Sequence, residues 1–226
     1  VPPTVNYWKY IREVCDKYNV HLIIDEVWCG TGTSGKIYCI DWDQVSPDFI
    51  FLGKTLGAGY VPISAVLTSS KIEAIIKNGS GRIENSTTFQ GHSLAIAAAY
   101  GVQSLIHEDG FVEEVDRKGI LFRSLLTDHF KDHEFFKNVR GRGVRNTMEI
   151  SCENEHLFGL SVTERMKNEH GIIINGKWHR FTFSNAMIIS DQEIEWVLDK
   201  FSLCFKSEAS KWTKKRAGLV KVKQFF

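Results

Sequence analysis

Long hydrophobic runs are missing from this sequence of 226 residues. A membrane-spanning helix needs roughly 18 consecutive apolar residues, and no stretch of the chain approaches that length. The first residues also lack the pattern of a signal peptide, so we expect no membrane partner. The chain is nevertheless 43% hydrophobic, with 15 Phe and six Trp, which is enough apolar surface for a sizeable folded core.

A regular pattern of cysteine or histidine is missing as well. The five cysteines are scattered and form no CxxC pair; they are Cys15, Cys29, Cys39, Cys152 and Cys204. An odd, scattered set favours free thiols in a reducing compartment over a disulfide framework or a zinc site, so we expect a cytoplasmic protein. His129 and His133 lie four residues apart without a third ligand at a suitable spacing, and we therefore expect no metal.

Neither sign of charge dominates, since the net charge is +1. The exception is the C-terminal segment from Lys206 onward, which contains seven basic residues and one acidic residue, Glu208. A basic tail can bind nucleic acid or an anionic surface. This one lacks an RNA-binding signature and interleaved aromatic residues for base stacking. We interpret it as a solvated C-terminal helix and extension, and we expect no nucleic-acid partner.

Helical and strand-like patterns alternate along residues 1–132. Residues 7–18 have apolar side chains at helical spacing and lead into an apolar run at residues 21–25, which predicts one αβ unit. Further expected strands lie at residues 47–52 and 62–67, and further expected helices at residues 71–77, 94–107 and 111–130. This order suits the back half of a doubly wound α/β domain.

The pattern changes in residues 133–226. A glycine-marked entry near residue 139 leads into a strand, a helix follows at residues 157–170, and strands are expected at residues 172–174 and 180–189. A last helix is expected at residues 191–205. The order β-α-β-β-α predicts a small α+β domain.

Two apolar runs of the first region each end near a charged residue. LIIDEV (residues 22–27) reaches Asp25, and FLGKTLGAG (residues 51–59) reaches Lys54 among three glycines. Short apolar runs bounded by glycine are typical of strands in a parallel sheet, where ligands bind beyond the carboxyl ends of the strands. We therefore expect Asp25 and Lys54 at one edge of the sheet. Because a buried charge is costly unless it is paired or used, we interpret both as site residues.

The chemistry of these two side chains indicates one cofactor. A lysine amine forms a Schiff base with a carbonyl, and pyridoxal 5′-phosphate (PLP) is the carbonyl cofactor that needs one. An aspartate beside the ring nitrogen of PLP keeps that nitrogen protonated, so that the ring can accept electrons. We predict Lys54 and Asp25 as catalytic, cofactor-binding residues.

Three segments, in chain order, resemble the signatures of the class III aminotransferases, the ω-aminotransferase family of fold type I PLP enzymes. They are DEVWCGTGTSGK (residues 25–36), PDFIFLGKTLGAGYVPISAV (47–66) and STTFQGHSLAIAAA (86–99). The resemblance implies that residues 1–132 form part of the PLP-binding large domain, a mostly parallel sheet with helices on both faces. Residues 133–226 would then be the small C-terminal domain with its basic tail.

The resemblance also implies two further cofactor contacts and a dimer. Val27 matches the position that packs under the cofactor ring. Thr88 matches a threonine that reaches the cofactor phosphate of the neighbouring subunit, and a hydroxyl beside backbone N–H groups suits that task. We therefore expect a homodimer in which Thr88 contributes across the interface.

The sequence departs from the family at three points. Class III enzymes are about twice this length, so the resemblance covers only their second half; the first half carries the phosphate-gripping turn and the aromatic residue that stacks on the ring. Thr33 replaces a family arginine. Thr182 stands where many relatives have an arginine that binds a substrate carboxylate, and nearby Arg180 is the candidate for that role, because a guanidinium binds a carboxylate through two parallel hydrogen bonds.

The resemblance implies transamination between small molecules, from an amine or amino-acid donor to a 2-oxo acid or aldehyde acceptor. Lys54 would act as general base and general acid. Two alternatives stay open: a PLP-dependent aminomutase of the same family, which retains its intermediate, and a truncated, catalytically silent homologue that keeps the fold. Release of a free oxo product separates the first alternative from a transaminase.

Overall fold

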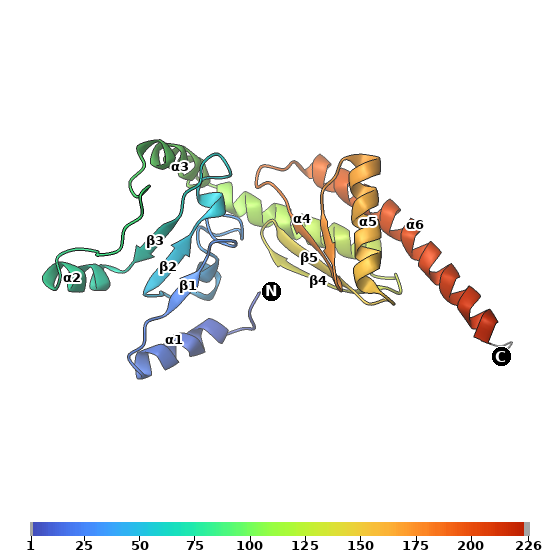
Figure 1. Cartoon of the computed structure of the whole chain (residues 1–226), viewed down its shortest axis with the longest axis horizontal. Coiled ribbons are helices and arrows are strands. Elements are labelled where there is room, and N and C mark those ends of the chain that lie inside the picture. The colour runs from blue at the N-terminus through green and yellow to red at the C-terminus, as the bar shows by residue number, and fades with distance from the viewer. Residues whose placement is uncertain (1, 224–226) are drawn as a thin grey trace. The chain divides into compact units, whose positions relative to one another are not determined.

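The computed structural model describes the chain from Pro2 to Lys223, with side chains given as far as Trp212. The chain forms two compact units, which divide between Arg117 and Lys118 inside helix α4 (Phe111–Phe130). Figure 1 shows a small sheet with helices in each unit, and each unit has its own hydrophobic core.

The first unit is built on a three-stranded sheet in the order β1-β2-β3. Strands β1 (Ile23–Asp25) and β2 (Phe49–Leu52) pair in parallel, whereas β3 (Ala65–Thr68) runs antiparallel to β2. All three strands occur where the sequence predicted strands. The third begins at Ala65 rather than at residue 62, which is a proline and has no N–H to donate to a neighbouring strand.

The helices of the first unit also follow the predicted pattern closely. They are α1 (Tyr7–Lys17), α2 (Ser70–Asn78) and α3 (Ser93–Ile106), with short 3-10 turns η1 (Cys39–Asp43) and η2 (Lys54–Leu56) after β1 and β2. The core of this unit is small. It consists of Leu22, Ile24, Ile40 and Val45, with Trp8, Ile11, Cys15 and Tyr38 packed against them.

Asp48 fastens helix α1 to the sheet. Its Oδ2 atom accepts a hydrogen bond from the backbone N–H of Leu22 at 2.8 Å and another from Arg12 Nη1 at 2.9 Å. The same arginine contacts Asp16 one turn further along α1, at 2.7 Å. The Leu22 amide, followed by Arg12, holds the pKa of Asp48 below its ordinary value.

The lowered pKa of Asp48 predicts a pH-dependent contribution to stability. The contribution is complete above the unfolded pKa of about 3.8 and is lost as the pH falls through the lower folded pKa. We expect Asp48→Asn to cost about 1 kcal/mol of unfolding free energy at pH 7 and almost nothing below both pKa values. Urea unfolding of both proteins across pH 2–7 measures this difference, with Asp128→Asn in the second unit, an exposed carboxylate paired with Lys131, as the control. An equal loss at every pH would contradict it.

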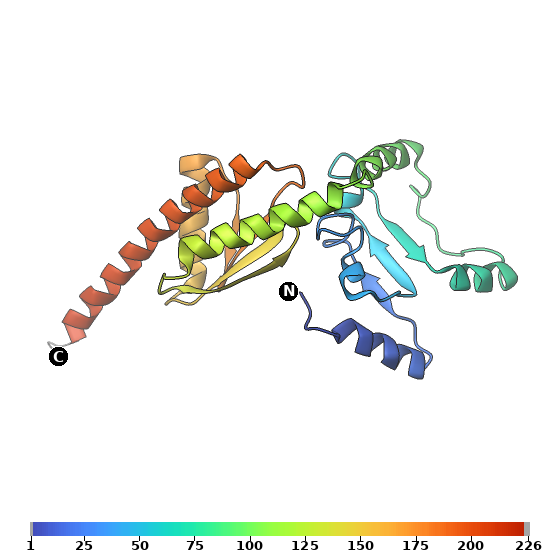
Figure 2. The same cartoon turned by 180° about the vertical axis from the view of Figure 1, so that it is seen from behind.

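The second unit is an antiparallel sheet in the order β4-β5-β7-β6. Its elements in chain order are β4 (Phe136–Arg142), β5 (Arg145–Ile150), α5 (Glu155–His170), β6 (Asn175–Lys177), β7 (Arg180–Ser184) and α6 (Asp191–Lys223). Figure 2 shows α6, and α4 from Lys118 onward, passing across one face of the sheet.

Three expectations for this unit were wrong in detail. The order is β-β-α-β-β-α, because the glycine-marked segment near residue 139 is a hairpin of two strands rather than the entry to one. Residues 172–174 precede the paired strand β6, and β7 ends at Ser184 rather than at residue 189. The last helix ends at Lys223, whereas the expected helix ended at residue 205; the interpretation of the tail as solvated concerns side chains beyond Trp212, which lie outside the described part of the chain.

Phenylalanine dominates the core of the second unit. Seven phenylalanine side chains are at most 2% exposed: Phe122, Phe130, Phe158, Phe181, Phe183, Phe201 and Phe205. Their rings meet edge-on or tilted; the centroids of Phe130 and Phe205 lie 4.8 Å apart, and those of Phe158 and Phe205 lie 5.0 Å apart. Burial of each such side chain is worth about 1.5–3 kcal/mol, so α4, α5 and α6 are held to the sheet mainly by aromatic packing.

No helix in the part of the chain that the structure describes is both long enough and apolar enough to cross a membrane.

Candidate active site

The carboxyl ends of β1 and β2 lie side by side. The parallel register places Asp25 opposite Phe51, and the backbone N–H of Glu26 continues the pairing by donating to Phe51 O at 2.9 Å. Lys54 follows the carboxyl end of β2 by two residues, at the same edge of the sheet. The structure therefore brings Asp25 and Lys54 to one edge, which agrees with the expectation from the strand pattern.

The carboxylate of Asp25 is oriented by its own backbone. Its Oδ1 atom accepts a hydrogen bond from the N–H of Val27 at 2.9 Å, which closes a short turn after the strand. The side chain is exposed, and among the side chains described, up to Trp212, its second oxygen, Oδ2, has no hydrogen-bond donor. The orientation of this carboxylate is fixed through Oδ1, and Oδ2 can accept a hydrogen bond from a cation or an N–H group of a ligand.

Lys54 has an unusual backbone conformation. Its φ angle is +45°, in the left-handed region that L-residues other than glycine, asparagine and aspartate rarely occupy. The turn that holds it is closed by backbone hydrogen bonds from Leu56 N to Gly53 O at 2.9 Å and from Gly57 N to Lys54 O at 3.2 Å. Strain of this kind gathers at functional sites, where the surrounding structure imposes it.

Two glycines allow close approaches beside Lys54. A Cβ atom at Gly53 would lie 3.3 Å from Val27 Cγ1, so the backbone before Lys54 packs directly on the side chain of Val27. A Cβ atom at Gly57 would lie 2.8 Å from Val61 O, which would force the turn away. Val27 is thereby held at the sheet edge between Asp25 and the lysine turn, where it offers a small apolar surface.

Helix α3 contacts the turn that contains Lys54, and the segment with Thr88 lies directly before this helix. Gln103 of α3 donates from Nε2 to Leu56 O at 3.1 Å. His92 caps the start of α3, where its Nδ1 accepts the N–H of Ala95 at 3.2 Å. Thr88 lies exposed in the turn before this cap, a turn closed by the hydrogen bond from Gln90 N to Thr87 O at 3.0 Å. The structure therefore gives His92 a structural task and leaves the hydroxyl of Thr88 facing solvent.

Sequence reasoning did not assign a role to Glu26, which the structure shows to be buried with 2% exposure. Its Oε2 accepts the N–H of Cys39 and its Oε1 accepts the N–H of Ile40, both at 2.7 Å. Burial raises the pKa of Glu26, although these two amides oppose the rise. Glu26 thereby fastens the loop of residues 28–38 to the strand end that carries Asp25. The sequence signal for this role was the presence of a second acidic residue directly after Asp25, at the end of an apolar strand.

The role of Glu26 predicts a large effect on stability. Glu26→Ala leaves two buried amides without an acceptor, so we expect a loss of about 2–4 kcal/mol in unfolding free energy. Glu26→Gln keeps the volume and one acceptor and avoids burying a charge, so its loss should be less than half as large. Urea unfolding of the three proteins tests this. Equal losses for both variants would show that the charge, rather than the amide contacts, matters.

Arg180, the candidate for binding a substrate carboxylate, begins strand β7 of the second unit. It is exposed and pairs through its backbone with Glu149 on one side and Lys177 on the other. The carboxylate of Glu149 accepts hydrogen bonds from Arg140 and Asn138. Among the described residues, the guanidinium of Arg180 has no ion-pair partner.

Comparison with known proteins decides the family. The family model described as "Aminotransferase class-III" matches residues 1–205. The chain belongs to the class III aminotransferases. An aminotransferase of Gibberella zeae is 38% identical over 222 residues, covering 88% of this chain and 42% of the relative. Ornithine aminotransferase 2 of Staphylococcus saprophyticus is 36% identical over 209 residues, covering 91% of this chain and 49% of the relative.

Solved structures confirm the fold type I architecture. The crystal structure of the ornithine aminotransferase from Toxoplasma gondii ME49 is 29% identical and has a TM-score of 0.81, covering 92% of this chain and 48% of that one. A second Toxoplasma gondii structure of that enzyme, with a TM-score of 0.82, is described as having partial occupancy of PLP at its active site. The chain spans about half the length of the curated relatives it matches.

Membership of this class III family implies dependence on PLP, and the residues at the sheet edge fit that cofactor. Asp25 offers a free carboxylate oxygen for a protonated ring nitrogen, and Val27 offers an apolar surface for the ring face. Lys54 offers an exposed amine on a strained, well-supported turn. These three residues lie within one unit and at one edge of one sheet.

Proposed function

We propose that this chain is the lysine-bearing part of a PLP-dependent transaminase that moves an amino group from an amine or amino-acid donor to a 2-oxo acid or aldehyde acceptor. The observation that carries the proposal is Lys54, held at φ +45° at the sheet edge where Asp25 ends the neighbouring parallel strand. The family match and the names of the relatives support the reaction class.

The proposed mechanism gives each side chain a separate task. PLP, when bound, supplies an electron sink for the negative charge that develops on the substrate carbon. Lys54 would hold the cofactor through Nζ in the resting enzyme, and Nζ would be free for proton transfer once the substrate amine is bound. The freed Nζ then removes the proton from the carbon that bears the amino group and afterwards donates it as a general acid. Asp25 holds the ring nitrogen in its protonated form through Oδ2.

Supporting contacts complete the proposed site. Val27 would pack against the ring face, and its side chain lies close beside the backbone of Gly53 at the sheet edge. Thr88 donates its hydroxyl to the cofactor phosphate of a second copy of the chain, a role that its exposed turn before α3 supports. The active form would then be a homodimer, in which each site is incomplete without the partner.

Arg180 is the proposed anchor for a substrate carboxylate. A planar guanidinium with no described ion-pair partner is available for two parallel hydrogen bonds to a carboxylate. Relatives are named ornithine aminotransferase and acetylornithine aminotransferase, which supports an amino-acid donor. The acceptor would be a 2-oxo acid or an aldehyde.

Covalent trapping of the cofactor tests this function without relying on turnover. The purified protein is titrated with PLP, reduced with borohydride, digested and analysed by peptide mass spectrometry. We expect one modified residue, Lys54, together with a visible absorption band that reduction removes. Lys36→Ala is a matched control, since Lys36 lies in the loop after Asp25 and packs over Trp42 at 5.2 Å. Scattered labelling of surface lysines, or no band at all, would overturn the proposal in favour of a silent homologue.

A further inference from the structure

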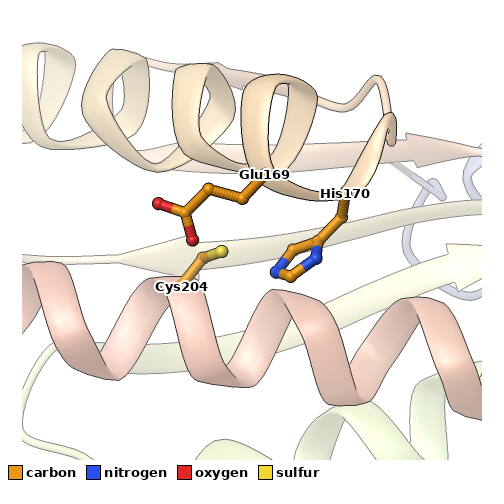
Figure 3. Close-up of side chains that lie close together, drawn as sticks. All are labelled: Glu169, His170 and Cys204. Atoms are coloured by element: carbon orange, nitrogen blue, oxygen red, sulfur yellow. The ribbon is translucent and has the colours of Figure 1, made fainter.

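Three side chains of types that can bind a metal ion lie close together between helices α5 and α6, within the second unit. They are Glu169, His170 and Cys204, and their ligand atoms all lie within 4.8 Å of one another. Figure 3 shows the carboxylate of Glu169 and the ring of His170 reaching from the end of α5 toward the thiol of Cys204 on α6. All three residues belong to the second unit, whereas the proposed cofactor residues Asp25, Val27 and Lys54 belong to the first.

We propose that Glu169, His170 and Cys204 bind a zinc ion, with water as the fourth ligand. A thiolate, an imidazole and a carboxylate are the three side-chain ligands that zinc uses, and a site with three protein ligands leaves one position for water. A thiolate with an imidazole selects a borderline-soft metal over magnesium or calcium, which take oxygen ligands. Binding releases the thiol proton of Cys204 to solvent, so the thiolate and the carboxylate together balance the charge of the ion.

The end of α5 explains how consecutive residues can bind one ion. Side chains at neighbouring helical positions normally diverge. His170 is the last residue of α5, and Gly171 follows in the left-handed conformation at φ +68°. Hydrogen bonds from Gly171 N to Lys167 O at 3.0 Å and from Ile172 N to Met166 O at 3.1 Å fix this ending. The terminal histidine can therefore turn toward the same point as Glu169.

A second layer of contacts orients the carboxylate ligand. Arg165 donates to both oxygens of Glu169, at 2.6 Å and 2.9 Å, and also donates to Glu208 Oε1 at 3.2 Å. Each oxygen of Glu169 keeps a further lone pair for a metal, and ligating carboxylates are commonly hydrogen-bonded in this way. Glu208 also accepts from Lys211 Nζ at 2.5 Å, so the two carboxylates of Glu169 and Glu208 together balance the two positive charges of Arg165 and Lys211.

Access and shielding also suit a metal. Cys204 is 1% exposed, so α6 covers the ion on one side, whereas Glu169 is exposed and His170 is half-buried. A metal can thus enter from solvent beside α5 and bind against the buried thiol. Because the bound ion joins α5 to α6, it should stabilise the second unit as its concentration rises above the dissociation constant.

Cobalt(II) is a suitable probe, because a thiolate ligand gives it a strong near-ultraviolet charge-transfer band. The full chain is freed of metal with a chelator and titrated with cobalt(II), then with zinc(II) as a competitor. We expect a single ion per chain, a thiolate-to-cobalt band and displacement by zinc. His170→Gln should weaken binding at least about tenfold but retain the band, since the loss of a ligand costs no less than the loss of a supporting contact. Cys204→Ser should abolish the band.

The controls separate loss of a ligand from loss of folding. Cys152→Ser removes another thiol of the same unit and should leave the band and the affinity unchanged. Circular dichroism identifies a variant that fails to fold, and His170→Gln, at a half-buried helix end, keeps the test valid if the buried Cys204→Ser variant does fail. Absence of a thiolate band in the parent chain, or unchanged affinity in His170→Gln, would overturn the proposal.

Discussion

Lys54→Ala should lower transamination by the natural protein by more than about a thousandfold while leaving its fold intact. Proton transfer by a positioned side chain alone contributes about 10²- to 10⁴-fold, and this variant also loses the residue proposed to bind the cofactor in the resting state. The measurement is single-turnover reaction of the PLP-loaded protein with an amine donor. Restoration of part of the rate by added small primary amines would show that the missing group is the amine itself.

The backbone of Lys54 offers an independent test of the same residue. At φ +45° a lysine is strained, and glycine accepts this conformation freely. Lys54→Gly should therefore raise the unfolding free energy by up to about 1 kcal/mol, although it removes activity as completely as alanine does. Urea unfolding of the alanine and glycine variants separates the two effects. A glycine variant less stable than the alanine variant would contradict the strain argument.

Much of the candidate site could be predicted from local sequence. Asp25 and Lys54 each follow an apolar run, and parallel pairing of two such runs leaves little choice about where their carboxyl ends meet. The glycines around Lys54 also indicated a turn, and in the structure Gly53 and Gly57 lie close to Val27 and Val61. Patterns that depend on neighbouring residues along the chain were therefore sufficient here.

Features that depend on distant residues escaped prediction. Glu26 acquires its importance from the amides of Cys39 and Ile40, which nothing in the strand pattern connects to it. Cys204 meets His170 across 34 residues of sequence, without a spacing motif. Strand β4 was missed because its sequence, FKNVRGR, shows no alternation of polar and apolar residues, whereas β5, whose burial alternates along the strand, lies where one strand was predicted.

Asp25→Asn should lower both cofactor affinity and turnover, and the structure allows the two functions of this side chain to be separated. Asparagine keeps an oxygen that can accept the N–H of Val27, now 2.9 Å from Asp25 Oδ1, so the turn after β1 survives. The negative charge is lost, and the ring nitrogen of a bound cofactor then has no charged partner. Removing one member of a hydrogen-bonded charge pair costs about 2–5 kcal/mol, or roughly 30-fold to several-thousand-fold in rate.

Comparison with Asp25→Ala distinguishes charge from geometry. Alanine removes the charge and the contact to Val27 together, so it should lose as much turnover as asparagine and, in addition, some unfolding free energy. Turnover, PLP titration and urea unfolding of both variants give the three quantities, and Asp16→Asn on the exposed face of α1 serves as the charge control. If asparagine retained full turnover, the carboxylate would be a turn residue, and the proposed pairing of Asp25 with the cofactor would be wrong.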